Sequence, residues 1–359
     1  MRGRPTEMSV TATALDDHRI ARMSPLISPA LLRHEFPVSP EVAGVVGRGR
    51  TEVVDILDGR DDRLLVIVGP CSIHDPDAAL EYAQRLAAVN QRLSGDLRIV
   101  MRTYFEKPRT TVGWKGLIND PELSGGFDVN RGLRLARQLL LDVSALGLPV
   151  GCEFLDPITP QFIADIVSWG SIGARTAASQ THRQLCSGLS MPIGIKNSTS
   201  GDIGDAVDGI RAAAASHVFM GINLDGIAAL VTTTGNTDCH LMLRGGASGP
   251  NYSAAQVSDA LGKLESAGLP ARLMIDASHG NSGKDHTRQP GVVRDIAARL
   301  ADGERGIAGV MLESFLVAGR QDLGGATMVR GQSVTDACID WDTTATLLDE
   351  LAAAVRARR

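Results

Sequence analysis

The chain has 359 residues, of which 43% are hydrophobic and 21% charged, and its formal net charge is -5. This composition is typical of a globular protein, and no apolar run approaches the ~18 residues that a membrane span requires. A general nucleic-acid surface needs an excess of Lys and Arg on one face, which a negative chain does not favour. We therefore expect neither a membrane nor a nucleic acid as a partner.

The cysteines and the N-terminus indicate a cytoplasmic protein. The five cysteines form no CxxC pair and are odd in number, which is typical of reduced thiols. The first residues carry Arg and Thr but lack the apolar segment of a secretory signal.

Residues 1–63 predict an N-terminal extension, because they are too few and too polar to bury a core of their own. Ser39 followed by Pro40 is typical of a helix start, with the serine as N-cap and the proline in the first turn. We expect this extension to make oligomer or regulatory contacts.

Residues 64–359 predict one catalytic (β/α)8 barrel. Short β-rich runs alternate with segments of helical periodicity such as 78–93 and 130–146, which indicates a parallel sheet with right-handed crossovers. A barrel of this type holds ~250 residues as one unit. The runs 217–223 and 228–236 are too close for a crossover helix, so we expect an inserted antiparallel β-hairpin at about 217–234.

The predicted barrel strands share one property, a charged or metal-capable side chain at the carboxyl end. These residues are Cys71, Arg102, Glu153, Arg175, Lys196, Arg244, His279 and Glu313. Because the carboxyl ends of parallel barrel strands converge on one mouth, we expect these side chains to surround one cavity, the active site.

The cations of this set, with the loop KPRTTVGWKG at 107–116, indicate an anion site. A solvated basic loop is the alternative, and any single strand-end cation could instead form a structural ion pair. Arg102 closes an apolar run, which a surface role does not explain. Since Arg175, Lys196 and Arg244 occupy the same place on later strands, we expect a small molecule bearing both phosphate and carboxylate.

Cys71, His279, Glu313 and Asp336 are candidate metal ligands. A thiolate, an imidazole and two carboxylates suit one divalent ion such as Mn, Fe(II), Co or Zn better than Mg, which avoids sulfur. Taken singly, Cys71 is more often a core thiol and His279 a hydrogen-bonded core histidine. Asp276 is positioned in sequence to orient His279.

The motifs GPCSIHDP, KPRTTVGWKG, GARTAASQ, IDASHGNS and VTDACIDW resemble those of the type I 3-deoxy-D-arabino-heptulosonate 7-phosphate (DAHP) synthases, in the subclass regulated by aromatic amino acids. The resemblance runs from about Asp16 to Arg358. It implies a metal-bearing (β/α)8 barrel that condenses phosphoenolpyruvate with erythrose 4-phosphate at the first step of the shikimate pathway.

The resemblance also implies a role for each matching residue. It gives Cys71, His279, Glu313 and Asp336 to the metal, and Arg102, Lys107, Arg175, Lys196 and Arg244 to phosphoenolpyruvate. Pro108, Arg109 and Thr110 would hold erythrose 4-phosphate, and Asp336 would be a further substrate-binding residue. Lys107 would act as proton donor, Glu153 would order the reacting water, and Cys71 and His279 would act in catalysis through the metal.

Regulation and assembly follow from the same resemblance. Residues matching the inhibitor site of the family are Asp16, Asp17, Gln161, Ser190, Phe219, Gly221 and Val231. Gly221 leaves room for a phenol where some relatives have serine, so we expect tyrosine as the inhibitor. The resemblance also implies a homodimer or homotetramer. Ala177-Ala178 and Phe315 depart from the usual motifs.

Two other functions stay open from the sequence. One keeps the barrel and the phosphoenolpyruvate site but takes another phosphorylated aldehyde in a specialised pathway. The other is a regulatory partner that binds ligand or another shikimate enzyme without catalysis.

Overall fold

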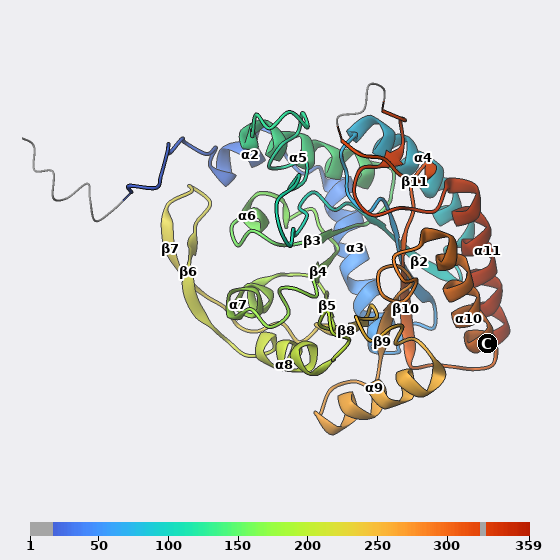
Figure 1. The fold of residues 1–359 in the computed structure, drawn as a ribbon. Coiled ribbons are helices and arrows are strands. Elements are labelled where there is room, and N and C mark those ends of the chain that lie inside the picture. The colour runs from blue at the N-terminus through green and yellow to red at the C-terminus, as the bar shows by residue number, and fades with distance from the viewer. Residues whose placement is uncertain (1–16, 324–327) are drawn as a thin grey trace, which may run out of the picture.

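The computed structural model describes residues 17–323 and 328–359, and its centre is a closed barrel of parallel strands (Figure 1). The strands neighbour one another in the order β1-β10-β9-β8-β5-β4-β3-β2. Their bounds are β1 Leu64–Gly69, β2 Leu97–Arg102, β3 Val150–Glu153, β4 Trp169–Ile172, β5 Ile193–Lys196, β8 His240–Leu243, β9 Leu273–Asp276 and β10 Ile307–Glu313. The predicted (β/α)8 barrel is confirmed.

The barrel strands are buried almost continuously because helices cover their outer faces. The helices after residue 64 are α4 Pro76–Leu93, α5 Val129–Ala145, α6 Thr159–Ile163, α7 Gln180–Gly188, α8 Gly204–Ala213, α9 Ala254–Ser266, the short 3-10 helix η1 His286–Arg288, α10 Gln289–Ala301 and α11 Trp341–Arg358. In the described part of the chain, no helix combines the length and the apolar character needed to cross a membrane.

The extension before the barrel contains α2 (Pro29–Glu35) and α3 (Pro40–Leu57). As predicted, α3 begins at Pro40, and the Ser39 hydroxyl accepts a hydrogen bond from the Val42 N–H. The buried side chains Val53 and Ile56 of α3 join the core cluster that fills the inside of the barrel. Figure 1 shows α3 lying behind the strands, so this helix closes the amino-terminal end of the barrel.

The inserted hairpin is also confirmed. Strands β6 (Val218–Ile222) and β7 (Ala228–Thr232) pair in antiparallel register, with Val218 opposite Thr232. Figure 1 shows the hairpin at the left, outside the barrel and beside α6 and α7. A second small sheet, β11 (Val317–Arg320) with β12 (Gln332–Ser333), leads from β10 to the segment that carries Asp336.

Candidate active site

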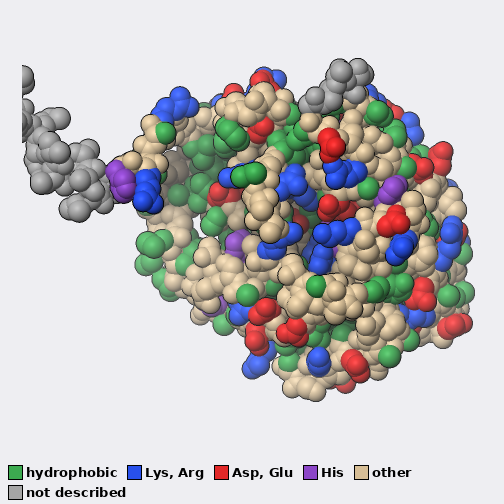
Figure 2. All heavy atoms as spheres, viewed as in Figure 1, with side chains coloured by type: hydrophobic (Ala, Val, Ile, Leu, Met, Phe, Trp, Pro, Cys, Tyr) green, Lys and Arg blue, Asp and Glu red, His purple; other side chains and the backbone are tan. Residues whose placement is uncertain are grey.

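The carboxyl ends of the barrel strands surround a cavity of about 710 Å³. Most predicted site residues line it: Lys107, Pro108, Arg109, Thr110, Glu153, Arg175, Lys196, Arg244, His279 and Asp336. Figure 2 shows Lys and Arg side chains gathered near the centre of this face, with acidic side chains beside them. The sequence placed these residues on many separate segments, and the barrel brings them to one mouth.

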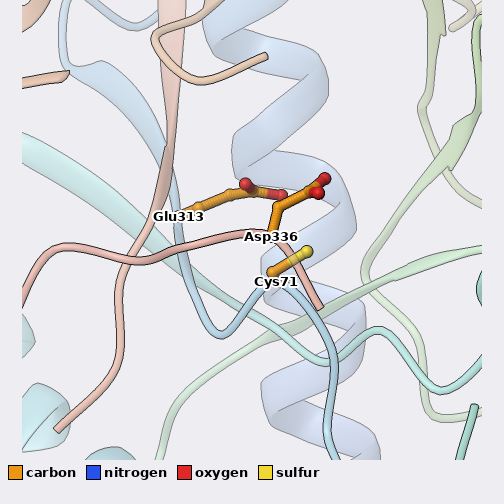
Figure 3. Close-up of side chains that lie close together, drawn as sticks. All are labelled: Cys71, Glu313 and Asp336. Atoms are coloured by element: carbon orange, nitrogen blue, oxygen red, sulfur yellow. The ribbon is translucent and has the colours of Figure 1, made fainter. Parts of the chain in front are cut away.

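Three of the four candidate metal ligands lie together. One ligand atom each of Cys71, Glu313 and Asp336 falls within 4.8 Å of the other two. Figure 3 shows that the three side chains come from three separate segments: the loop after β1, the end of β10 and the loop after β12. A sulfur and carboxylate oxygens at this spacing can contact one ion, and this donor set suits a borderline divalent cation.

His279 lies beside this group but is not part of it. Its Nε2 is 3.8 Å from Glu313 Oε1, and its Nδ1 is 2.9 Å from Asp276 Oδ2. The backbone of His279 has a φ of 53°, in the left-handed region that is uncommon outside glycine. The imidazole therefore faces Glu313 on one side and Asp276 on the other.

Burial of Cys71, reinforced by Glu313, raises the pKa of its thiol, although Lys107 opposes the shift. The Lys107 Nζ lies 3.2 Å from the Cys71 Sγ and 3.1 Å from the Cys71 carbonyl oxygen. A divalent ion bound here would displace the thiol proton. Burial opposes ionisation of Asp336, but Lys107 and His279 outweigh it and lower the pKa of that carboxyl.

Arg102 lies beneath the cavity and does not line it. Its side chain is fully buried, and its Nη2 lies 2.7 Å from Glu313 Oε1. The guanidinium also donates to the carbonyl oxygens of Pro70 and Cys71 and stacks 3.8 Å from the centre of the Tyr104 ring. In this structure Arg102 donates hydrogen bonds to Glu313 and Cys71, two of the candidate metal ligands. A direct contact of Arg102 with phosphoenolpyruvate stays a prediction.

Asp276 joins two parts of the site. Its Oδ2 lies 3.2 Å from Lys196 Nζ as well as close to His279, although neither approach is aligned as a hydrogen bond. The Ser278 hydroxyl donates to Asp276 Oδ1 at 2.5 Å and lies 2.8 Å from His279 Nδ1. The predicted orienting role of Asp276 for His279 agrees with these contacts, and the contact with Lys196 was not foreseen.

Comparison with known proteins identifies the family. The sequence profile described as the DAHP synthetase I family matches residues 35–349. The chain belongs to this family.

Several relatives cover the chain almost completely. A phospho-2-dehydro-3-deoxyheptonate aldolase of Corynebacterium glutamicum is 56% identical, over 97% of this chain and 96% of the relative. A Phe-sensitive enzyme of that name from Escherichia coli is 54% identical, over 96% and 98%, and a tyrosine-inhibited one from Schizosaccharomyces pombe is 50% identical, over 96% and 94%. The structure of a phospho-2-dehydro-3-deoxyheptonate aldolase from Francisella tularensis has a TM-score of 0.93 and 48% identity, covering 95% of this chain and 99% of that one. The resemblance read from the motifs is confirmed.

A second cavity of about 790 Å³ lies between the β6–β7 hairpin, α6 and α7 of this DAHP synthetase I family member. Five residues of the predicted inhibitor site line it: Gln161, Ser190, Phe219, Gly221 and Val231. Asp17 does not line this cavity, and Asp16 lies outside the described residues.

The roles of Tyr104 and Glu106 and the surroundings of Phe315 were not predicted from the sequence. Tyr104 is buried beneath Arg102, and its ring centre lies 5.9 Å from Lys107 Nζ. The only signal in the sequence was an aromatic residue between the end of β2 and the basic loop 107–116. Phe315 packs edge-on against His74, whose Nδ1 has no hydrogen-bond partner among the described residues. Nothing in the structure assigns a function to Ala177-Ala178.

The Glu106 side chain connects the loop of residues 107–116 to residues 155–159, which lead into α6. Its buried carboxylate accepts hydrogen bonds from the N–H groups of Leu155 and Asp156 and from the Thr159 hydroxyl. Burial, assisted by the charge of Asp156, raises the pKa of Glu106 to about 7 in spite of these bonds. Glu106 directly precedes Lys107, so it fixes one end of the loop that carries Lys107, Pro108 and Arg109.

This pKa predicts a pH-dependent stability. Because the folded state holds a proton on Glu106 that the unfolded chain has lost above about pH 4.5, the free energy of unfolding should fall as the pH rises from about 4.5 to about 7. Glu106→Gln removes the titrating carboxyl. The free energy of unfolding of the variant, relative to that of the unaltered chain, should therefore be higher at pH 8 than at pH 5 by on the order of 2–3 kcal/mol. Denaturant unfolding at both pH values measures it, with the exposed Glu122→Gln as control. An equal difference at both pH values would refute the shift.

Proposed function

We propose that this chain is a 3-deoxy-7-phosphoheptulonate synthase, which condenses phosphoenolpyruvate, D-erythrose 4-phosphate and water to DAHP and phosphate. The observation that carries the proposal is one cavity lined by Lys107, Arg175, Lys196 and Arg244 directly beside the thiol and carboxylates of the candidate metal group. Neutral or singly charged substrates would not need so many cations in a chain of net charge -5.

A bound divalent ion, Mn, Fe(II), Co or Zn, would act as a Lewis acid toward the aldehyde. Cys71, Glu313 and Asp336 would hold it, with His279 beside Glu313 as a further ligand. The donor chemistry and the spacing of these side chains support this assignment.

The cations divide between the two substrates. Lys196 and Arg244 are nearly buried, and both lie at the carboxyl ends of neighbouring strands, which suits the phosphate and carboxylate of phosphoenolpyruvate. Arg175 would complete that site from the loop after β4. Arg109 is exposed and is held by a hydrogen bond from its Nε to the Trp114 carbonyl oxygen, which suits the phosphate of erythrose 4-phosphate with Pro108 and Thr110.

Lys107 is the proposed proton donor, because its ammonium group lies between the thiol of Cys71 and the open cavity. As the enol carbon attacks the aldehyde, the ammonium would give its proton to the aldehyde oxygen. Glu153 lines the same cavity, and its Oε1 occupies the space that a Cβ on Gly173 would need. We assign Glu153 to order the water that adds before phosphate leaves by C–O cleavage.

A panel of phosphorylated aldehydes, with phosphate release from phosphoenolpyruvate as the signal, tests the substrate. Erythrose 4-phosphate should give the highest kcat/KM. A higher value for another aldehyde would favour the specialised-pathway function, and the absence of turnover with every aldehyde in a metal-loaded protein would favour the regulatory partner.

We also propose that tyrosine binds in the second cavity as an inhibitor. Arg33 and Arg50 supply cations for the amino-acid carboxylate, and Phe219 and Val231 supply apolar contacts for the ring. A Cβ on Gly221 would meet Val231 Cγ2 at 2.9 Å, so the glycine keeps this part of the cavity open.

Tyrosine should therefore inhibit the unaltered chain more strongly than phenylalanine does, and Gly221→Ser should weaken the tyrosine effect by about 10-fold or more in concentration, which corresponds to ~1.4 kcal/mol. Steady-state inhibition curves with each aromatic amino acid measure this. Inhibition by phenylalanine alone would contradict the assignment.

The proposal extends to assembly and location. Met220 and Leu230 of the hairpin are 90% and 73% exposed, which supports a homodimer or homotetramer that covers them. All five cysteines are buried and unpaired, which supports a reducing, cytoplasmic compartment. The segment of residues 1–63 would then make oligomer or regulatory contacts while α3 closes the barrel.

A further inference from the structure

Cys71 and Asp336 lie on two separate loops, and side chains of neighbouring residues join these loops. Cys71 lies in the loop after β1, and Asp336 lies in the loop after β12. In the described part of the chain, no backbone hydrogen bond joins segments 70–72 and 334–338. Another contact must therefore fix the spacing of the thiol and the carboxylate.

The hydroxyls of Ser72 and Thr335 make this contact. Their oxygens lie 2.7 Å apart, across 263 positions of sequence, and the two residues are 0% and 7% exposed. Each is the chain neighbour of a candidate metal ligand, Ser72 of Cys71 and Thr335 of Asp336. A buried hydroxyl pair at this distance is a directional link, and removal of one hydroxyl leaves the other without this partner.

Cys338 adds a weaker link in the same direction. Its Sγ accepts a hydrogen bond from the Cys71 N–H at 3.4 Å, and the Ile339 N–H donates to the Glu313 carbonyl oxygen at 3.0 Å. Among the described residues, the loop of Asp336 is thus joined to β10 by a backbone hydrogen bond, but to the loop of Cys71 only by hydrogen bonds that involve a side chain. Loss of one hydroxyl would remove the stronger of these two links between the loops of Cys71 and Asp336, while the backbone link to β10 would remain.

We propose that Ser72 and Thr335 are positioning residues that hold Cys71 and Asp336 at the spacing a divalent ion requires. This inference rests on the proposed function, since it takes these two side chains as metal ligands. Residues that orient ligands from behind change metal affinity by roughly 10–100-fold when they are removed. Ser72 and Thr335 act as one unit, so removing either hydroxyl should have the effect of removing both.

The test is a titration of the metal-free chain with Co(II), in which the absorption band of the cobalt–thiolate bond reports binding and gives the Kd. Thr335→Val and Ser72→Ala should each raise the Kd by about 10-fold or more. The double variant should bind no more weakly than the weaker single variant, and Thr335→Ser, which keeps the hydroxyl, should bind like the unaltered chain. The Thr335→Ser result also separates loss of the hydroxyl from loss of the threonine methyl group.

The chain offers a matched control. Ser187, in α7, and Thr233 form another buried hydroxyl pair, also 2.7 Å apart, which lies outside both the active-site cavity and the metal group. Thr233→Val should leave the Co(II) affinity unchanged. Unchanged affinity in Thr335→Val and Ser72→Ala, or an equal loss in Thr233→Val, would overturn the positioning role while leaving the proposed function standing. Absence of a thiolate band in the unaltered chain would overturn both.

Discussion

Replacement of Lys107 by Met should lower kcat by about 10²–10⁴-fold while the metal content stays unchanged. Methionine has a similar length but no proton to give, and it carries no charge toward the developing oxyanion. The Lys107 Nζ lies 3.2 Å from the Cys71 Sγ, so the ammonium group is next to the candidate metal ligands without being one of them. Phosphate release at saturating substrates, with metal measured by atomic absorption, tests both parts.

Lys115→Met is the matched control for this variant. Lys115 belongs to the same loop, but it is exposed and does not line the active-site cavity. Its replacement should leave kcat close to that of the unaltered chain. If Lys107→Met retained full turnover, the ammonium group would have no part in the chemistry, and the proton would have to come from another group.

Replacement of Cys71 by Ala should abolish tight metal binding and turnover together. The loss of affinity should exceed the roughly 10–100-fold that follows from losing an outer hydrogen-bond partner, because the variant loses one of the converging donor atoms itself. Cys152→Ala is the control, since Cys152 is equally buried in β3 but lies outside the metal group and contacts Thr103. If the Cys71 variant bound the metal as tightly as the unaltered chain does, Cys71 would be a buried core thiol and not a metal ligand.

The barrel could be predicted from the sequence because its signals are local. Each strand is a short apolar run, and Ser39-Pro40 and the close spacing of 217–223 and 228–236 mark a helix start and a hairpin. The position of α3 could not be predicted, since the contact of Val53 and Ile56 with the barrel interior depends on how distant segments pack.

The site was predictable to the level of the strand end and no further. Parallel topology brings Lys196, Arg244 and His279 to one cavity whatever their side-chain conformations. Side-chain direction decides the rest: Arg102 turns beneath the cavity to Glu313, and His279 lies beside the metal group. The contact between Ser72 and Thr335 joins residues 263 positions apart, which no local pattern reveals.

The proposed synthase activity can be measured by incubating the purified chain with phosphoenolpyruvate and erythrose 4-phosphate and determining DAHP and phosphate together. We predict that the two products form in equal amounts, that a chelator stops the reaction, and that Mn(II) or Co(II) restores it. Phosphate release without DAHP would show that the chain does not condense these two substrates, and turnover that persists in the fully chelated protein would show that the reaction does not need the metal.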